Sequence, residues 1–240
     1  DNSMSKAQLD SVLMRLEKLG DPKAVEGMAR YGIKSARAYG ISAPVLRKIA
    51  REIGKDHTLA QQLWSTGVLE ARILAAFIDE PEKVTEKQME RWVTDFDNWA
   101  ICDACCSNLF DQTSFAWTKT IEWSPRKEEF VKRAAFALIA ALAVHDKKAE
   151  DKQFLKFLPI IKRDSTDERN FVKKAINWAL RQIGKRSLEL NRIAVQTAKE
   201  IQKLDSRSAK WIAADALREL TSAAVRRRLK KKKDPSDKRQ

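Results

Sequence analysis

The sequence predicts an all-α protein, a solenoid of antiparallel helix pairs with a concave basic face. Three observations lead to this prediction. Apolar residues recur at helical spacing almost throughout the 240 residues, while the alternating pattern of strands is scarce. Segments of small residues return at a roughly constant interval along the chain. The excess of positive charge is concentrated in the second half of the sequence.

The apolar periodicity predicts an almost continuous succession of helices. A first helix over residues 5–19 ends at the turn-forming residues 20–22, and a second runs from 22 to about 30. Ser42 is a suitable N-cap for a helix that ends at Arg51, with Pro44 in its first turn. Further helices are expected over residues 56–65, 68–79, 83–95, 98–110, 113–122, 126–144, 148–163, 167–183, 186–203 and 206–229.

Segments rich in alanine and other small residues begin at positions 71, 101, 133, 174 and 209, which are 30, 32, 41 and 35 residues apart. This interval is typical of HEAT-like helix pairs, in which each pair buries its apolar face only against its neighbours. Stacked pairs curve, and their inner helices line an extended concave surface. We therefore expect one solenoid domain over residues 1–225. The basic tail, 226–240, is expected to be disordered beyond its first turn.

The net charge of +14 is unevenly distributed along the chain. Residues 1–125 carry 16 Lys and Arg against 18 Asp and Glu, residues 126–192 carry 17 against 9, and residues 226–240 carry 9 against 2. Such basic regions favour a nucleic-acid partner, and the alternative is a solvated basic face. The longest apolar run, 134–144, is too short to span a bilayer. We expect a cytoplasmic, nucleoid-associated protein without membrane contact.

The stretch from Asp97 to Asp103 combines a helix start with two unusual side chains. On the helix expected there, Trp99 and Asp103 are four residues apart and share a face. An indole beside a carboxylate suits a cationic, sugar-bearing ligand, because the ring offers CH and cation–π contacts and the acid stabilises positive charge. The alternative for Asp103 is an ordinary solvated carboxylate. Its apolar neighbours instead favour an acid that is paired or has a function.

Trp178 lies in a stripe of basic residues formed by Lys174, Arg181 and Lys185 at helical spacing. One exposed ring among cations suits a phosphate backbone. The alternative is a core tryptophan whose basic neighbours extend past it to solvent. Packing roles are expected for the other five tryptophans, which are Trp64, Trp92, Trp117, Trp123 and Trp211.

The three cysteines, Cys102, Cys105 and Cys106, contain one C-x-x-C spacing. A zinc site would need a second pair of ligands, which the isolated His57 and His145 do not provide. A redox motif would need a strand–helix junction, which the pattern lacks. We interpret the cysteines as small core residues in a reducing compartment, and expect no metal and no cofactor.

Four stretches carry a family resemblance: residues 39–44 with Arg47, Trp99 with Asp103, the run Lys132, Arg133, Ala134 and Ala135, and residues 174–181 with Trp178. Through these stretches the chain, from about residue 28 to residue 220, resembles the AlkD-type DNA glycosylases, the HEAT-repeat family that excises alkylated bases. The active cleft of that family holds two tryptophans, an aspartate and an arginine. Two departures from the family pattern are Ala100, where an acid often follows the tryptophan, and a longer interval around residues 145–153.

The resemblance implies a monomeric, monofunctional glycosylase that hydrolyses the N-glycosidic bond of cationic N3- or N7-alkylated purines in double-stranded DNA. Asp103 would stabilise positive charge on the deoxyribose and orient water, while Trp99 and Trp178 would flank the lesioned sugar. The base need not be flipped, and no lysine is placed as a Schiff-base nucleophile, so we expect no lyase step. Arg133 would hold a phosphate near the lesion, with further backbone contacts from Lys132, Lys174, Arg181, Lys185 and Arg47.

Two other functions fit the same helical, basic chain. One is a catalytically silent HEAT-repeat module that binds branched or damaged DNA. The other is a scaffold for protein or RNA whose concave face is basic. The presence of Trp99, Asp103, Arg133 and Trp178 together favours the enzyme.

Overall fold

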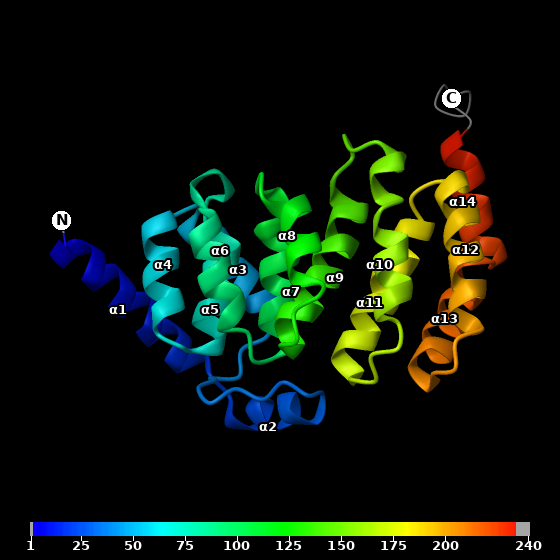
Figure 1. Ribbon diagram of the computed structural model, residues 1–240. Helices are drawn as coiled ribbons and strands as arrows, with labels where there is room; N and C mark the ends of the chain where they lie inside the picture. Colours follow the sequence, from blue (N-terminus) through cyan, green and yellow to red (C-terminus); the bar gives the residue numbers. More distant parts are fainter. Residues whose placement is uncertain (1, 234–240) are drawn as a thin grey trace. The chain divides into compact units, whose positions relative to one another are not determined.

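The computed structural model describes residues 2–233, and this part of the chain contains fourteen α-helices, three short 3-10 helices and no strand (Figure 1). The all-α prediction is confirmed. Contacts within the chain define an N-terminal unit, Asp1–Ala116, and a C-terminal unit, Trp117–Gln240. The expected single domain over 1–225 stays a prediction.

The N-terminal unit is built around α5, which packs against α3, α4 and α7. The core of this unit includes Trp64 and Trp92, whose rings stack with centroids 3.9 Å apart. Its elements are α1 (Asn2–Leu19), α2 (Pro22–Arg30), α3 (Ala43–Ile53), α4 (His57–Ser65), α5 (Leu69–Ile78), η1 (Pro81–Lys83), α6 (Glu86–Thr94), α7 (Trp99–Asn108) and η2 (Phe110–Gln112).

Side-chain caps fix where several of these helices begin. Asp56 accepts the backbone N–H of Leu59 at the start of α4, and Asn98 accepts that of Ile101 at the start of α7. Ser42 occupies the predicted N-cap position of α3, but its side chain makes no capping hydrogen bond. Helix α3 instead has proline in its first turn, where the missing N–H has no cost.

The C-terminal unit is built around α11, which packs against α9, α12 and α13. Its helices are joined by short turns, and α14 covers α12 and α13 at the end of the described chain. The elements are α8 (Ala116–Trp123), α9 (Glu129–His145), η3 (Asp151–Phe154), α10 (Phe157–Asp164), α11 (Asn170–Gly184), α12 (Leu188–Gln202), α13 (Arg207–Leu220) and α14 (Ala223–Lys233).

The recurrent small-residue segments fall on α5, α7, α9, α11 and α13, which are alternate helices along the chain. Most of their alanines are completely buried, as at Ala75, Ala134, Ala175 and Ala213, while Ala104 is half-buried and Ala214 is exposed. Small side chains let neighbouring helices approach closely, so these segments are the contact faces of the stacked pairs. The interval between small-residue segments in the sequence therefore matches the interval between alternate helices in the structure.

Two predicted helices are divided in the structure. Residues 148–163 form η3 and α10 rather than one helix. Residues 206–229 form α13 and α14, and the Oγ of Ser222 accepts the backbone N–H of Val225 at 3.3 Å to start α14. Helix α14 also continues to Lys233, so the disorder expected beyond the first turn of the tail is wrong over this range. Residues 234–240 lie outside the described residues.

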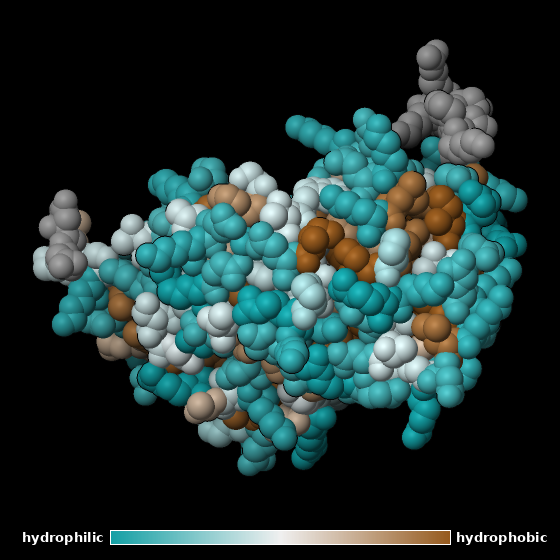
Figure 2. All heavy atoms as spheres, in the orientation of Figure 1, coloured by the Kyte–Doolittle hydropathy of each residue, from teal (hydrophilic) through white to brown (hydrophobic). Residues whose placement is uncertain are grey.

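Burial agrees with most of the packing roles expected for the cysteines and tryptophans. Cys102, Cys105 and Cys106 are fully buried. Trp211 is the exception, because it is 39% exposed beneath the ammonium group of Lys173. In the space-filling view most of the visible face is hydrophilic, with apolar residues in separate areas (Figure 2). None of the helices described is both long enough and apolar enough to cross a membrane.

Candidate functional site

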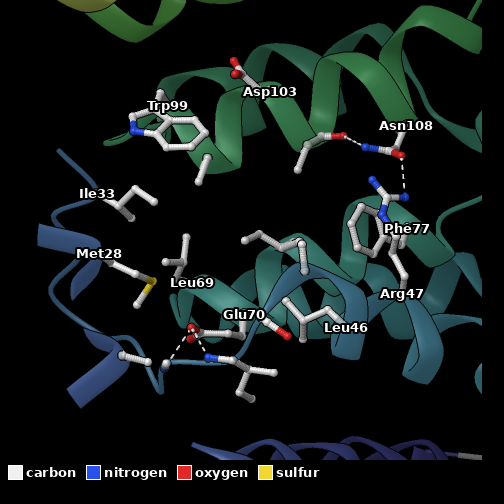
Figure 3. Close-up of a pocket in the computed structure, with 18 of the residues that line it drawn as sticks. Met28, Ile33, Leu46, Arg47, Leu69, Glu70, Phe77, Trp99, Asp103 and Asn108 are labelled. Atoms are coloured by element: carbon white, nitrogen blue, oxygen red, sulfur yellow. Dashed lines mark hydrogen bonds between the residues drawn. The ribbon is translucent and has the colours of Figure 1, made fainter. Parts of the chain in front are cut away.

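A cavity of about 510 Å³ opens in the N-terminal unit between α2, α3, α5 and α7 (Figure 3). Its lining is mainly apolar, and its few polar groups come from separate elements. Cavities of this size and character are where small ligands or parts of larger ones bind. The lining includes Met28, Ile33, Leu46, Leu69, Ile73 and Phe77, together with Arg47, Glu70, Trp99, Asp103 and Asn108.

Trp99 and Asp103 both border this cavity. Trp99 is the first residue of α7, and its half-buried indole donates its Nε1–H to the carbonyl of Tyr31 at 2.8 Å. Asp103 lies one turn later and is also half-buried. Figure 3 shows its carboxylate pointing away from Leu46 and Leu69, which form the cavity floor. The helical spacing therefore places an indole at one wall of the cavity and an acid at its rim.

Arg47 enters the same cavity from α3. Its guanidinium lies 4.5 Å from the ring centroid of Phe77, and its Nη1 donates to the Oδ1 of Asn108 at 3.3 Å. These contacts hold the exposed arginine at the cavity edge. Three residues predicted for the site, from positions 47, 99 and 103, are thus brought together within one unit.

Glu70 is a residue of this cavity that sequence reasoning missed. Its carboxylate is 1% exposed and accepts three backbone N–H groups, those of Tyr39 at 2.7 Å, Gly40 at 3.0 Å and Ile41 at 3.4 Å. A buried carboxylate must be satisfied in this way. Glu70 therefore fixes the segment 39–44, which forms one wall. The available signal was an acid between Leu69 and the first small-residue segment, which begins at residue 71.

Gly40 allows this wall to form. Its φ of +83° is accessible to glycine but strained for other residues, and an added Cβ would lie 2.2 Å from the carbonyl oxygen of Asp21. The N–H of Asp21 in turn donates to the carbonyl of Tyr39 at 2.8 Å. The close approach of the segment to the start of α2 thus depends on glycine.

In the C-terminal unit, Trp178 is half-buried on α11, beside an exposed Lys174. The rest of the predicted basic stripe is ion-paired. Arg181 Nη1 lies 2.9 Å from Glu219 Oε2, and Lys185 Nζ lies 2.7 Å from Glu219 Oε1. Burial acts to raise the pKa of Glu219, but the hydrogen bonds from Lys185 and Arg181 outweigh it and the pKa is lowered. The stripe is therefore interrupted by an acid from α13.

Arg133 and Lys132 also have protein partners. Arg133, on α9, is 7% exposed, and its Nη1 donates to the carbonyl of Phe171 at 2.6 Å. The Nζ of Lys132 lies 3.3 Å from Asp164 and 3.7 Å from Asp167. A phosphate would have to compete with these partners, which the sequence pattern did not reveal.

The cysteines offer no nucleophile. Burial raises the pKa of the Cys105 and Cys106 thiols well above the usual value, so both are protonated at neutral pH. Among the described residues there is no group of three or more His, Cys, Asp or Glu side chains arranged to hold a metal ion. The charged side chains that line the cavity are Arg47, Glu70 and Asp103, and Glu70 is engaged with the backbone of segment 39–41.

Comparison with known proteins agrees with this architecture. A solved structure described as "a new family of proteins related to the HEAT-like repeat DNA glycosylases with affinity for branched DNA structures" is similar, with a TM-score of 0.73 and 19% sequence identity over 88% of this chain and 94% of that chain. This similarity shows the HEAT-like fold. No curated protein matches the sequence. The family model described as "DNA alkylation repair enzyme" matches residues 12–220, most of the chain. The protein belongs to the DNA alkylation repair enzyme family.

Proposed function

We propose that the protein is a monofunctional DNA glycosylase that hydrolyses the N-glycosidic bond of cationic N3- or N7-alkylated purines in duplex DNA. The observation that carries the proposal is the pair Trp99 and Asp103, which border one cavity in a member of a DNA alkylation repair family. We expect it to act as a monomer in the cytoplasm, at the nucleoid, with no cofactor and no lyase step.

Hydrolysis of this glycosidic bond needs little catalytic assistance from the protein. Alkylation at N3 or N7 leaves the purine positively charged, so the base departs with the bonding electrons as a neutral molecule. Positive charge then develops on the deoxyribose, and a fixed carboxylate stabilises it. Asp103 supplies this carboxylate and orients the water that adds to C1′ and loses its proton to solvent. The products are an abasic site and the free base.

The two tryptophans bind the cationic nucleotide. A ring face attracts a cation by about 0.5–2 kcal/mol, more when water is excluded. Trp99 and Trp178 are both half-buried, so part of each ring is available for such contact while the rest is packed. The hydrogen bond from Trp99 to Tyr31 fixes the orientation of the first ring.

Phosphate contacts come first from the exposed basic residues. Among the predicted contacts, Arg47 and Lys174 are exposed. The other four predicted contacts already have protein partners and would exchange or share them on binding DNA. These are Arg133, Lys132, Arg181 and Lys185. Charge-assisted contacts of this kind position the duplex without reading its sequence.

A second candidate function is binding of branched DNA without catalysis. It is favoured by the solved structure with the similar fold, which is described as having affinity for branched DNA structures. Under this alternative Trp99 and Asp103 contact a strand end or junction rather than a lesion.

Release of 7-methylguanine from a methylated duplex, followed in single-turnover reactions, tests the proposal. Asp103→Asn should slow release by about 10²–10³-fold, the typical effect of losing one preorganised electrostatic group, while leaving DNA affinity unchanged. Asp97→Asn is the matched control, since Asp97 is an exposed acid just before α7. Absence of release by the parent protein, together with preference for a four-way junction over duplex, would support the alternative.

A further inference from the structure

The C-terminal unit carries a second hollow of about 550 Å³, which shares no residue with the cavity around Trp99. It lies where the C-terminal ends of α9 and α11 approach η3 and α14. Five cationic side chains and one acidic side chain line it. These are Lys147, Lys185, Arg186, Arg228, Lys232 and Asp151.

Helix α14 supplies two of the cations through its amphipathic spacing. Val225 and Leu229 are buried, and α14 packs against α12 and α13. These apolar residues fix the rotation of the helix. Arg228 and Lys232 are four residues apart, so they share a face, and both line the hollow.

Arg186 forms a rigid wall of the hollow. Its guanidinium donates to the carbonyls of Ala143 at 3.1 Å and Ala149 at 2.6 Å and to the Oδ1 of Asp151 at 3.1 Å. It also lies 4.4 Å from the ring centroid of Phe154. The single acid of the lining is thus already occupied by one cation.

The remaining cations line the same hollow with few acidic groups to balance their positive charge. Lys185 is paired with Glu219, whereas Lys147, Arg228 and Lys232 are exposed and form no ion pair with any described residue. Partial desolvation of its ammonium group and repulsion from Arg228, Lys147 and Arg186 lower the pKa of Lys232, against the opposing effect of Asp151. A bound anion would relieve this repulsion.

We propose that this hollow is a phosphate-binding site formed by Arg228 and Lys232 of α14 with Lys147 and Arg186. Arginine and lysine together suit phosphate oxygens, and a cavity of this size admits more than one phosphate group. The phosphates belong either to a DNA backbone or to a free ligand such as pyrophosphate. The family model ends at residue 220, before α14 begins at Ala223, so the site lies partly outside the matched region. The proposal does not depend on glycosylase activity.

The first experiment measures affinity for an unmodified duplex as a function of salt. The double variant Arg228→Gln/Lys232→Gln is compared with Arg226→Gln/Lys230→Gln, which removes the same charge from exposed positions of the same helix that do not line the hollow. If the hollow holds backbone phosphates, the slope of log affinity against log salt should fall by about 1.8 in the first variant only. The parent should then lose about tenfold more affinity than this variant between about 50 and 200 mM salt.

The second experiment measures melting temperature with and without pyrophosphate. If the hollow holds a free phosphate ligand, pyrophosphate should raise the melting temperature of the parent and of the control variant, but not of Arg228→Gln/Lys232→Gln. Loss of this stabilisation with an unchanged salt slope assigns the site to a free ligand. Equal behaviour of the two double variants in both experiments overturns the proposal.

The melting temperature of the double variant without ligand shows whether it is folded. Without ligand, Arg228→Gln/Lys232→Gln should melt at or above the parent temperature, because it removes mutual repulsion. If this variant unfolds, Lys147→Gln provides the same test from outside α14, with Lys148→Gln as its exposed neighbour for control. An effect of Lys147→Gln no larger than that of Lys148→Gln would also contradict the site.

Discussion

The carboxylate of Glu70 accepts the backbone N–H of Gly40 at 3.0 Å, although the two residues are 30 positions apart in the sequence. This contact joins α5 to the segment that walls the candidate cavity. It lies inside the protein, since Glu70 is 1% exposed. The shape of the cavity therefore depends on a charge that solvent does not reach.

Replacing Glu70 with glutamine should destabilise the protein. The amide keeps one acceptor oxygen but points donor hydrogens at other N–H groups, so part of a charge-assisted network is lost. Such bonds contribute about 1.5–3 kcal/mol each, and we expect the free energy of unfolding to fall by about 2–3 kcal/mol in urea titrations. Glu82→Gln, at an exposed position, is the control. Equal stability of the two variants would show that Glu70 does not hold the wall.

Trp99→Ala should slow release of 7-methylguanine, because it removes a ring face and its tether to Tyr31. A cation–π contribution of about 0.5–2 kcal/mol corresponds to a rate loss of about 2- to 30-fold. Trp99→Phe keeps a ring and should recover most of the rate. Trp211→Ala, at another exposed tryptophan, should leave the rate unchanged. Equal rates for the Phe and Ala variants of Trp99 would argue against a role for the ring.

Arg133→Ala should lower stability as well as excision. Removal of the guanidinium leaves the half-buried Phe171 carbonyl without this donor, at a cost of about 1–3 kcal/mol. Thermal melting and urea unfolding measure the effect, with Lys127→Ala at an exposed position as the control. If Arg133 and Trp178 hold one nucleotide, the rate losses of Arg133→Ala and Trp178→Ala should also be non-additive by about 0.5–3 kcal/mol. Strictly additive losses would separate the two residues functionally.

Glu219→Gln should strengthen DNA binding. It releases Arg181 and Lys185 from the carboxylate that pairs them, so both become available to phosphates. One added phosphate contact raises the salt slope by about 0.9, which fluorescence titration at several salt concentrations resolves. Glu189→Gln removes an equal charge from a pair with Arg192 and should change the slope less. Identical slopes would exclude Arg181 and Lys185 from the interface.

The interaction of Glu219 with Arg181 and Lys185 also makes the stability of the protein depend on pH. Because the pKa of Glu219 is lowered in the folded protein, its ionised form contributes stability above the normal glutamate pKa of about 4.5. That contribution is lost as pH falls through the lowered pKa. The stability difference between the parent and Glu219→Gln should thus be present at neutral pH and shrink below about pH 4.5. Urea midpoints measured from pH 7 to pH 3 check this, and a constant difference would contradict it.

Local spacing predicted the parts of the site that depend only on helical geometry. Trp99 and Asp103 were expected to share a face because they are four residues apart, and both border one cavity. The location of Arg47 beside them could not be derived in this way. Its partner Asn108 lies 61 residues further along the chain, so only the family resemblance pointed to it.

Features that depend on long-range pairing were missed. The roles of Glu70 and Glu219 arise from backbone and side-chain partners about 30 to 40 residues away, which periodicity does not reveal. The break between α13 and α14 was missed because apolar residues continue on both sides of it, from Leu220 to Val225 and Leu229, and the cap signal comes from one residue, Ser222. Counting charges in the sequence likewise overestimated how many cations of the basic stripe are available to a ligand, because Arg181 and Lys185 are paired with Glu219.

Helix α14 also covers the last helix pair of the described chain, α12 and α13. Each pair buries its apolar face against the next, so the last pair would offer an open face to any similar surface. Val225 and Leu229 cover that face from one side of α14, while the exposed Arg226, Arg227 and Lys230 turn its other side to water. Helix α14 therefore shields apolar surface of α12 and α13 from water, and a chain cut after Leu220 should self-associate through these uncovered helices.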